Sequence, residues 1–108
     1  MSEVAGRLSE RVVVMTPVTV DDDEGGKTTT WSTVASVKAA VEPLTRQERL
    51  QAVASETTVT HRVTIRWIAD VTSRSRLHWG DRVLEVVGPP VEIGRRNLLE
   101  CDCAERVL

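Results

Sequence analysis

Two cysteines and two histidines are the residues of this chain best suited to bind a metal. Cys101 and Cys103 are separated by one residue, whereas zinc-binding cysteine pairs usually have about two to four residues between them. Residues two apart in a strand share a face, so we expect both thiols to face the core, reduced and without a mutual disulfide. With His61 and His78 they do not make a recognisable ligand set, and the sequence predicts no metal site.

The chain also has few candidate catalytic residues. His61 falls on the apolar side of its expected strand, which indicates a partly buried histidine with a polar partner. A nucleophilic triad would need a neighbouring Ser or Cys and a carboxylate, and no G-x-S-x-G motif occurs. Gly26-Lys27-Thr28 ends like a phosphate-binding loop, but Asp21 stands where that motif needs its first glycine. We therefore predict no catalytic residue, no cofactor and no enzymatic activity.

Charged residues are the more informative group. Four consecutive carboxylates lack the spacing of an EF-hand loop and form either a solvated loop or an electrostatic docking surface. The arginines have three possible roles: they are exposed to solvent on the surface, they pair with the acidic loop of a neighbouring subunit, or they contact phosphate. A head-to-tail ring joins two different patches, so opposite charges on separate segments would suit it. The candidate docking residues are Asp21, Asp22, Asp23, Glu24, Arg62, Arg66, Arg74 and Arg76, with Arg82, Arg95 and Arg96 further along the chain.

Alternation of apolar and polar residues predicts the strands that position these groups. Residues 12–20 form a first strand in which Pro17 indicates an edge position or a bulge, and residues 21–29 form a loop. Residues 30–42 form a second, long strand. One side of this second strand is expected to carry Trp31, Thr33, Ala35, Val37, Ala39 and Val41.

The clearest strand spans residues 57–67. Its apolar side carries Val59, His61, Val63, Ile65 and Trp67. A one-residue slip would bury two arginines, so the register is fixed. Residues 70–80 read as a polar connection, and further strands are expected at residues 82–87, 91–93 and 96–103.

A short helix is expected between the second and third strands. Thr45 and Glu48 match a capping box, and Leu50, Val53 and Ala54 have helical spacing. This predicts a helix over residues 46–54 with one apolar edge.

Composition limits the classes of protein. The chain has 108 residues, of which 41% are hydrophobic and 28% charged, the composition of a globular protein; we expect one domain, residues 1–108. No apolar run approaches the roughly 20 residues of a membrane span, and the N-terminus lacks a signal-peptide pattern. A net charge of −2 argues against a generic DNA or membrane binder. The elements predict a mainly β fold, a small antiparallel barrel or sandwich of five to six strands with one short helix.

A family resemblance extends through nearly the whole chain. The matching segments are Gly6-Arg7-Leu8 with Arg11-Val12, Asp23-x-Gly25-Gly26, Thr30-Trp31, Ala39-x-Val41-Glu42-Pro43-Leu44, Arg46-x-Glu48 with Ala52, Thr60-His61-Arg62-Val63-Thr64-Ile65-Arg66, Trp79-Gly80-x-Arg82 and Leu98-Leu99-x-Cys101. In this order they resemble the head–tail joining proteins, also called head-closure or stopper proteins, of long-tailed phages and phage-like particles. Arg46 departs from the glycine that the family often has there.

The resemblance implies a small β-barrel that assembles as a homo-oligomeric ring, typically of twelve subunits, in the head–tail neck of a virion built in the bacterial cytoplasm. The ring would lie beneath the portal-associated adaptor, retain packaged double-stranded DNA, and present a docking surface to the tail terminator or another tail protein. No membrane is involved. A loop projecting into the channel would correspond to residues 42–56. On the polar side of its helix, Arg46, Gln47, Arg49 and Gln51 would face DNA phosphates.

Two alternatives stay open. One is an adaptor or tail-completion protein of the same neck. The other is a stand-alone nucleic-acid-binding barrel of the OB or SH3-like kind, for which Trp31, Trp67 and Trp79 supply few stacking surfaces. Because free strand edges favour aggregation, we also expect the isolated chain to stay mostly monomeric until a head offers a template.

Overall fold

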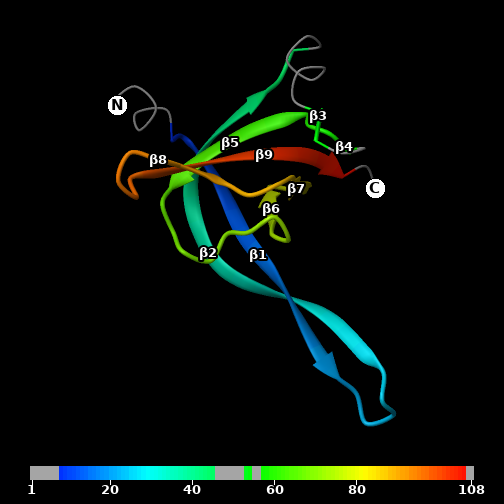
Figure 1. The fold of residues 1–108 in the computed structure, drawn as a ribbon. Helices are drawn as coiled ribbons and strands as arrows, with labels where there is room; N and C mark the ends of the chain where they lie inside the picture. The colour runs from blue at the N-terminus through cyan, green and yellow to red at the C-terminus, as the bar shows by residue number, and fades with distance from the viewer. Residues whose placement is uncertain (1–7, 46–52, 55–56, 107–108) are drawn as a thin grey trace.

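Nine β-strands form the regular structure of the described residues, 8–45, 53–54 and 57–106, in the computed structural model (Figure 1). No helix occurs among these residues. The strands are β1 Glu10–Asp21, β2 Lys27–Pro43, β3 Val53–Ala54, β4 Thr57–Thr58, β5 His61–Arg66, β6 Arg76–Trp79, β7 Arg82–Val86, β8 Val91–Ile93 and β9 Leu98–Arg106.

The strand pairings close on themselves. Seven strands are hydrogen-bonded in the order β5-β2-β1-β6-β7-β9-β8, and β5 also pairs with β9. Every one of these pairings is antiparallel. Because β5 pairs with both β2 and β9, the strands β5, β2, β1, β6, β7 and β9 form a closed barrel. β8 pairs with β9 beyond the end of β7. The separate pair β3–β4 lies outside this ring. The predicted mainly β, small antiparallel barrel is confirmed.

The core fills the inside of the barrel with aliphatic side chains and two thiols. Alternate residues of each strand point inward, as the pleat requires. Among the side chains with no exposed surface are Val12, Val14, Val63, Ile65, Leu77, Leu84, Cys101 and Cys103. Both cysteines are buried and free, as the sequence predicted.

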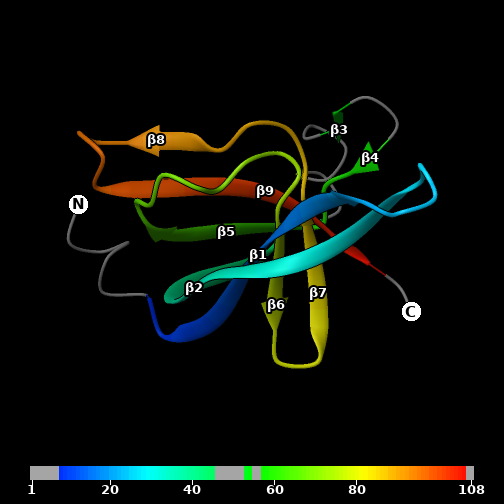
Figure 2. The same cartoon turned by 90° about the horizontal axis from the view of Figure 1, so that it is seen from below.

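A long hairpin leaves the barrel. β6 pairs with β1 only at residues 13–15 and β5 pairs with β2 only from residue 39 onward, whereas β1 and β2 stay paired as far as Asp21 and Lys27. We call residues 16–33 the arm. Residues 18–30 are all exposed, and Figures 1 and 2 show the hairpin projecting away from the barrel. The described molecule is accordingly elongated, 51 × 28 × 26 Å.

A β-bulge separates the arm from the barrel and corrects one prediction. Val14 pairs with Ala35, but the next residue, Met15, pairs with Thr33, so Val34 is an extra residue in β2. The extra residue reverses the alternation of β2. Trp31 and Thr33 therefore share a face with Met15 and lie outside, opposite to the face of Val37. Pro17 lies in the arm, where β1 has no second neighbour, as its missing amide predicted.

Four other boundaries differ from expectation. The first loop is shorter than residues 21–29, because Lys27 already pairs with Asp21. Residues 53–54, predicted as the end of a helix, pair with residues 57–58 as strands, and the rest of the predicted helix, residues 46–52, lies outside the described residues. The expected strand 57–67 is divided between β4 and β5. The supposed polar connection 70–80 contains β6, whose buried Leu77 completes the barrel wall.

Candidate functional site

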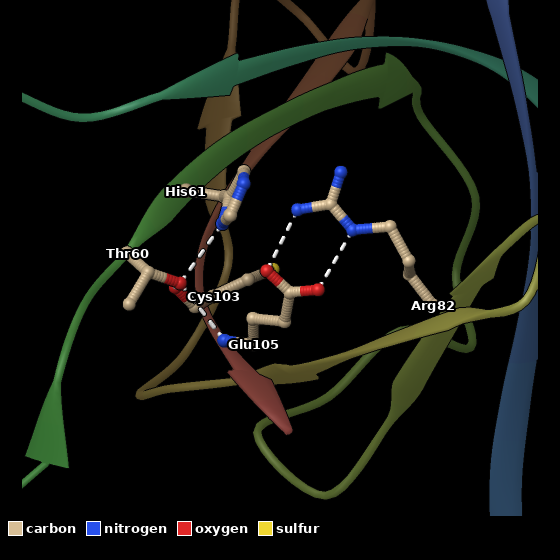
Figure 3. Close-up of polar contacts among 5 residues, drawn as sticks. All are labelled: Thr60, His61, Arg82, Cys103 and Glu105. Atoms are coloured by element: carbon tan, nitrogen blue, oxygen red, sulfur yellow. Dashed lines mark hydrogen bonds and ion pairs between the residues drawn. The ribbon is translucent and has the colours of Figure 1, made fainter. Parts of the chain in front are cut away.

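Polar side chains gather at one mouth of the barrel (Figure 3). Arg82 begins β7 and Glu105 lies near the end of β9, and both fall on inward-facing positions at the rim. The Arg82 Nε and Nη2 atoms donate hydrogen bonds of 2.7 Å each to the two carboxylate oxygens of Glu105. This bidentate pair, with Thr60 and His61, is the barrel-mouth cluster.

The ion pair stabilises the charged form of both partners. Its hydrogen bond, then the charge of the arginine, holds the pKa of Glu105 below its ordinary value, against an opposing desolvation effect. The pKa of Arg82 is raised, mainly by the same hydrogen bond. Charge-assisted bidentate contacts of this kind fix orientation as well as charge. They therefore hold the ends of β7 and β9 together at the rim.

Thr60 and His61 complete the barrel-mouth cluster. The Thr60 Oγ1 accepts a hydrogen bond of 2.8 Å from the backbone N–H of Glu105 and lies 2.8 Å from Nδ1 of His61. His61 is buried, and its ring meets that of Trp79 edge to face at 6.2 Å. The predicted buried histidine with a polar partner is confirmed. These contacts connect the start of β7, the end of β9 and the start of β5 at one mouth of the barrel.

A cavity of about 340 Å³ opens next to Trp79. The Trp79 Nε1 donates a hydrogen bond of 3.0 Å to the carboxylate of Glu10, and both residues line the cavity with Ser9, Ala40, Val41 and Glu42. In the barrel-mouth cluster the Thr60 hydroxyl lies beside the His61 imidazole, but this hydroxyl also accepts the backbone N–H of Glu105 and His61 is buried, so we interpret the pair as a structural contact. Burial raises the pKa of the Cys101 thiol to about 12 and raises that of Cys103 further, so these thiols are inert.

Each of the three tryptophans is covered by an arginine. The guanidinium carbons of Arg76, Arg82 and Arg96 lie 4.0, 4.5 and 4.8 Å from the ring centroids of Trp31, Trp79 and Trp67 respectively. A base stacking on the covered face of any of these rings would have to displace its cation–π partner. This arrangement weighs against a stand-alone nucleic-acid-binding barrel that uses exposed aromatic rings.

The four predicted docking arginines are dispersed. Arg62 on β5 lies 3.1 Å from Asp102 and 3.6 Å from Glu100, and Arg76 on β6 lies 3.8 Å from Glu85. Arg66 ends β5, and Arg74 lies in the connection before β6; neither forms an ion pair with the residues that the structure describes. The structure therefore does not gather these four residues into one patch.

The four predicted docking carboxylates lie together at the tip of the arm. Oδ1 of Asp22 accepts hydrogen bonds from the backbone N–H groups of Glu24, at 2.9 Å, and Gly26, at 2.7 Å. Gly25 supplies the left-handed backbone of the turn, with φ of 83°. Asp22 thus shapes the turn, and Asp21, Asp23 and Glu24 remain as exposed charges.

Some candidates lie elsewhere. Arg46, Gln47, Arg49 and Gln51 fall outside the described residues. Within the described ranges, no three His, Cys, Asp or Glu residues come together as a metal-binding group, and no helix has the length and apolarity to cross a membrane. Sequence reasoning did not predict the pairing of Arg82 with Glu105, because the two lie on different strands and no local pattern connects them.

The geometry defines the class as a small closed antiparallel β-barrel protein with an extended hairpin arm and a polar mouth. The chain belongs to the phage head completion protein family, whose model matches residues 4–106. It is thus a virion structural component. Head completion protein gp7 of Enterobacteria phage HK97 is 30% identical over 103 residues, 91% of this chain and 92% of that protein.

Two solved structures share the fold. Protein SF1141 of Shigella flexneri 2a is 28% identical, with a TM-score of 0.78 over 93% of this chain and 94% of that one. A chain of the virion of a native gene transfer agent particle is 21% identical, with a TM-score of 0.62 over 93% and 96% of the two chains. The barrel and its arm are therefore a shared architecture.

Proposed function

We propose that this head completion protein is the head-closure, or stopper, component of the neck. In this role it forms a ring below the portal-associated adaptor, retains the packaged DNA and offers the docking surface for the tail. The observation that carries the proposal is the family match over residues 4–106, nearly the whole chain. The protein acts by assembly and catalyses no reaction, in keeping with a polar mouth whose groups bind one another.

The segment between β2 and β5 supports a channel-facing loop. The backbone N–H of Leu44 donates a hydrogen bond of 2.9 Å to the carbonyl of Thr60, and Leu44 is buried. The chain therefore leaves the barrel and returns to it at one place. In this proposal the segment between these two anchors serves a partner. In this proposal Arg46, Gln47, Arg49 and Gln51 face the DNA in the channel of a twelve-subunit ring.

Deleting the gene in the producing cell tests the proposal. We expect full-sized heads that lose their DNA to DNase and carry no tails. Heads that keep their DNA but lack tails would assign the protein to the tail side of the neck instead. Normal, tailed, DNA-filled particles would overturn the role in the neck altogether.

Charge reversal in the loop separates DNA retention from docking. Arg46→Glu together with Arg49→Glu should weaken DNA retention more than tail attachment, because phosphate contacts are electrostatic. The matched control, Arg11→Glu with Lys38→Glu, makes the same change of charge on the outer barrel wall, where these two residues pair across β1 and β2. Equal loss of retention and attachment would make the loop an assembly surface.

The free protein should be mostly monomeric, because the ring needs the head as its template. Size-exclusion chromatography with light scattering measures this directly. A stable large ring of the isolated chain would show that the template is unnecessary.

A further inference from the structure

Four arginines of the barrel are paired within the chain, whereas the charges at the two ends of the molecule are not; Arg11 and Lys38 on the wall form no ion pair with the described residues either. Arg62, Arg76, Arg82 and Arg106 each lie within 4 Å of a carboxylate of their own chain. The exposed charges at the end of the arm form no ion pair with any described residue, and neither do those of the turn between β8 and β9. We call Asp21, Asp23 and Glu24 the acidic tip, and Arg66, Arg95 and Arg96 the basic corner.

The basic corner is built on a strained turn. Arg66 ends β5 and pairs with Leu98, which begins β9, so it lies beside the turn that holds Arg95 and Arg96. Arg96 has φ of 56° and is alone in this region among the described residues other than glycine. A left-handed conformation costs a bulky residue roughly 1–2 kcal/mol. Glycine or asparagine would avoid this strain, so the contacts of the arginine side chain must offset it.

The Arg96 side chain is also held in place. Its guanidinium lies over the ring of Trp67, at 4.8 Å from the centroid. That ring is fixed in turn by a hydrogen bond of 3.1 Å from its Nε1 to Glu92, and the Trp67 backbone N–H donates one of 3.1 Å to Asn97 in the turn. The positive charge is thus presented on a rigid support.

The two charged surfaces lie at opposite ends of the molecule. In Figures 1 and 2 the turn between β8 and β9 and the tip of the β1–β2 hairpin are at opposite sides of both views. The described residues extend over 51 Å in their longest dimension. The acidic tip therefore cannot reach the basic corner of its own chain, but it can reach that of a second copy.

Exposed apolar residues accompany both surfaces. Three large hydrophobic side chains stand out as exposed in the described ranges, namely Val18, Val20 and Val91, at 40%, 51% and 58%. Val18 and Val20 lie on the arm next to the acidic tip. Val91 begins β8, the strand that leads into the basic corner and pairs on one side only, with β9. Each end thus combines unpaired charge with uncovered apolar surface.

We propose that the acidic tip of one subunit docks on the basic corner of the next copy of this chain. The inference rests on the proposed ring and names the surfaces that join its subunits. Three carboxylates meet three guanidiniums, and the valines beside them become covered. Because the contact joins two different patches, it repeats from subunit to subunit until the ring closes.

Charge reversal in particles tests the contact. The tip variant is Asp23→Arg with Glu24→Arg and spares Asp22, whose side chain shapes the turn. The corner variant is Arg95→Asp with Arg96→Asp; aspartate tolerates the left-handed conformation better than most residues, which offsets the loss of the Arg96 contact to Trp67, and thermal unfolding of the purified variant checks that it folds. The measurement is the amount of this protein in purified particles, with DNase-protected DNA measured alongside it.

Each variant alone should lower incorporation at least about tenfold, because opposed like charges cost more than about 1.4 kcal/mol. The two variants combined in one chain should restore incorporation to within about threefold of the wild type, a factor of well under 1 kcal/mol. The matched control is Arg11→Asp with Lys38→Asp, which changes the net charge as much as the corner variant and should incorporate normally.

Cross-linking gives a second readout. Both native thiols are buried, so Asp23→Cys with Arg95→Cys places the accessible thiols at the two ends. A short bis-maleimide should convert this variant into a ladder of multimers in particles, whereas either cysteine alone should not form a ladder.

The outcomes separate the contact from the ring itself. Loss in both single variants with rescue in the combination supports the contact. If only the corner variant loses DNA, and the combined variant does not restore it, the contact between subunits is wrong and the basic corner is a phosphate-binding surface. If all variants are normal while gene deletion still releases DNA, the contact is wrong and the head-closure role stands. A deletion without effect would remove the proposed function itself.

Discussion

β1 and β2 form both the barrel wall and the arm. Residues of the same type are buried in the barrel wall and exposed in the arm. Val12 and Val14 have no exposed surface, whereas Val18 and Val20, further along β1, are 40% and 51% exposed. Nothing in the local alternation separates the two pairs. Both pairs lie opposite β2, but Val12 and Val14 face the inside of the closed barrel, whereas Val18 and Val20 lie in the arm, where β1 pairs with β2 alone. Period-two alternation therefore identifies a strand but does not show that its apolar face is covered within the same chain.

The electrostatics follow the same division. Ion pairs on the barrel wall join strands of one chain, as Arg62 joins β5 to β9 and Arg82 joins β7 to β9. The carboxylates of the acidic tip have no such partner among the described residues. Ion pairs therefore join strands within the barrel, and none joins the acidic tip to the described residues of its own chain.

Thiol reactivity should show the largest contrast between the two regions. Cys101 and Cys103 have no exposed surface, and burial raises the pKa of the Cys101 thiol to about 12. They should react with an aromatic disulfide reagent only when the barrel unfolds, whereas a Thr30→Cys thiol in the arm should react at once. We expect at least about a thousandfold difference in rate, set by the free energy of opening. Comparable rates would mean that the barrel opens easily.

Truncation of apolar side chains should give the next largest effect. Leu84→Ala in the barrel should lower the free energy of unfolding by about 2–5 kcal/mol. Val20→Ala in the arm, as the control, should change it by less than about 0.5 kcal/mol. Urea denaturation measures both. An equal loss in the two variants would show that the arm folds as part of the core.

The Arg82–Glu105 pair should make stability depend on pH. Because the folded protein lowers the pKa of Glu105, the pair stabilises the fold above the ordinary carboxyl pKa of about 4.3, and the benefit is lost as the pH falls through the lowered value. Glu105→Gln should be less stable than wild type at about pH 7 and should approach it in acid. Arg82→Gln should give the same flattened profile. A constant difference at every pH would exclude this ionic contribution.

The smallest effect is expected at the tip of the arm. Asp22→Ala removes the side-chain acceptor of the Glu24 and Gly26 amides, a local loss of about 1 kcal/mol. Hydrogen exchange of these amides should accelerate, while exchange in β5 and β9 stays as it was, because hairpin ends open without the barrel. Faster exchange throughout the barrel would mean that the two regions are coupled.

Local patterns predicted much of the wall. The alternation over residues 61–66 was predicted because one side of β5 faces the aliphatic core and the other carries Arg62 and Arg66, although Thr64 on that second side is buried as well. Val34, an apolar residue at a position expected to be polar, was the one local sign of the bulge. The short strand β6 was missed because Leu77 is its single fully buried residue and polar neighbours surround it.

The candidate surfaces were predicted less completely. The acidic run was visible as a charge cluster, but its position on a projecting arm depends on which strands pair beyond Met15. Arg66 and Arg96 come together because β5 pairs with β9, a contact between segments far apart in the chain. Arg82 and Glu105 meet for the same kind of reason. Pairing of distant strands is fixed by the closed fold, and no short-range pattern encodes it.

The separate pairing of the arm has a consequence for the evolution of its length. Beyond Met15 the two strands of the hairpin pair with each other and with no other described strand, and Arg76 of β6 contacts Trp31 at the base of the arm. Adding two residues to each strand would lengthen the arm by about 6.6 Å, at 3.3 Å per residue, and return every side chain to its former face. The pairing and packing of the barrel strands would stay unchanged. The reach of the arm is therefore adjustable in steps of two residues without refolding the barrel.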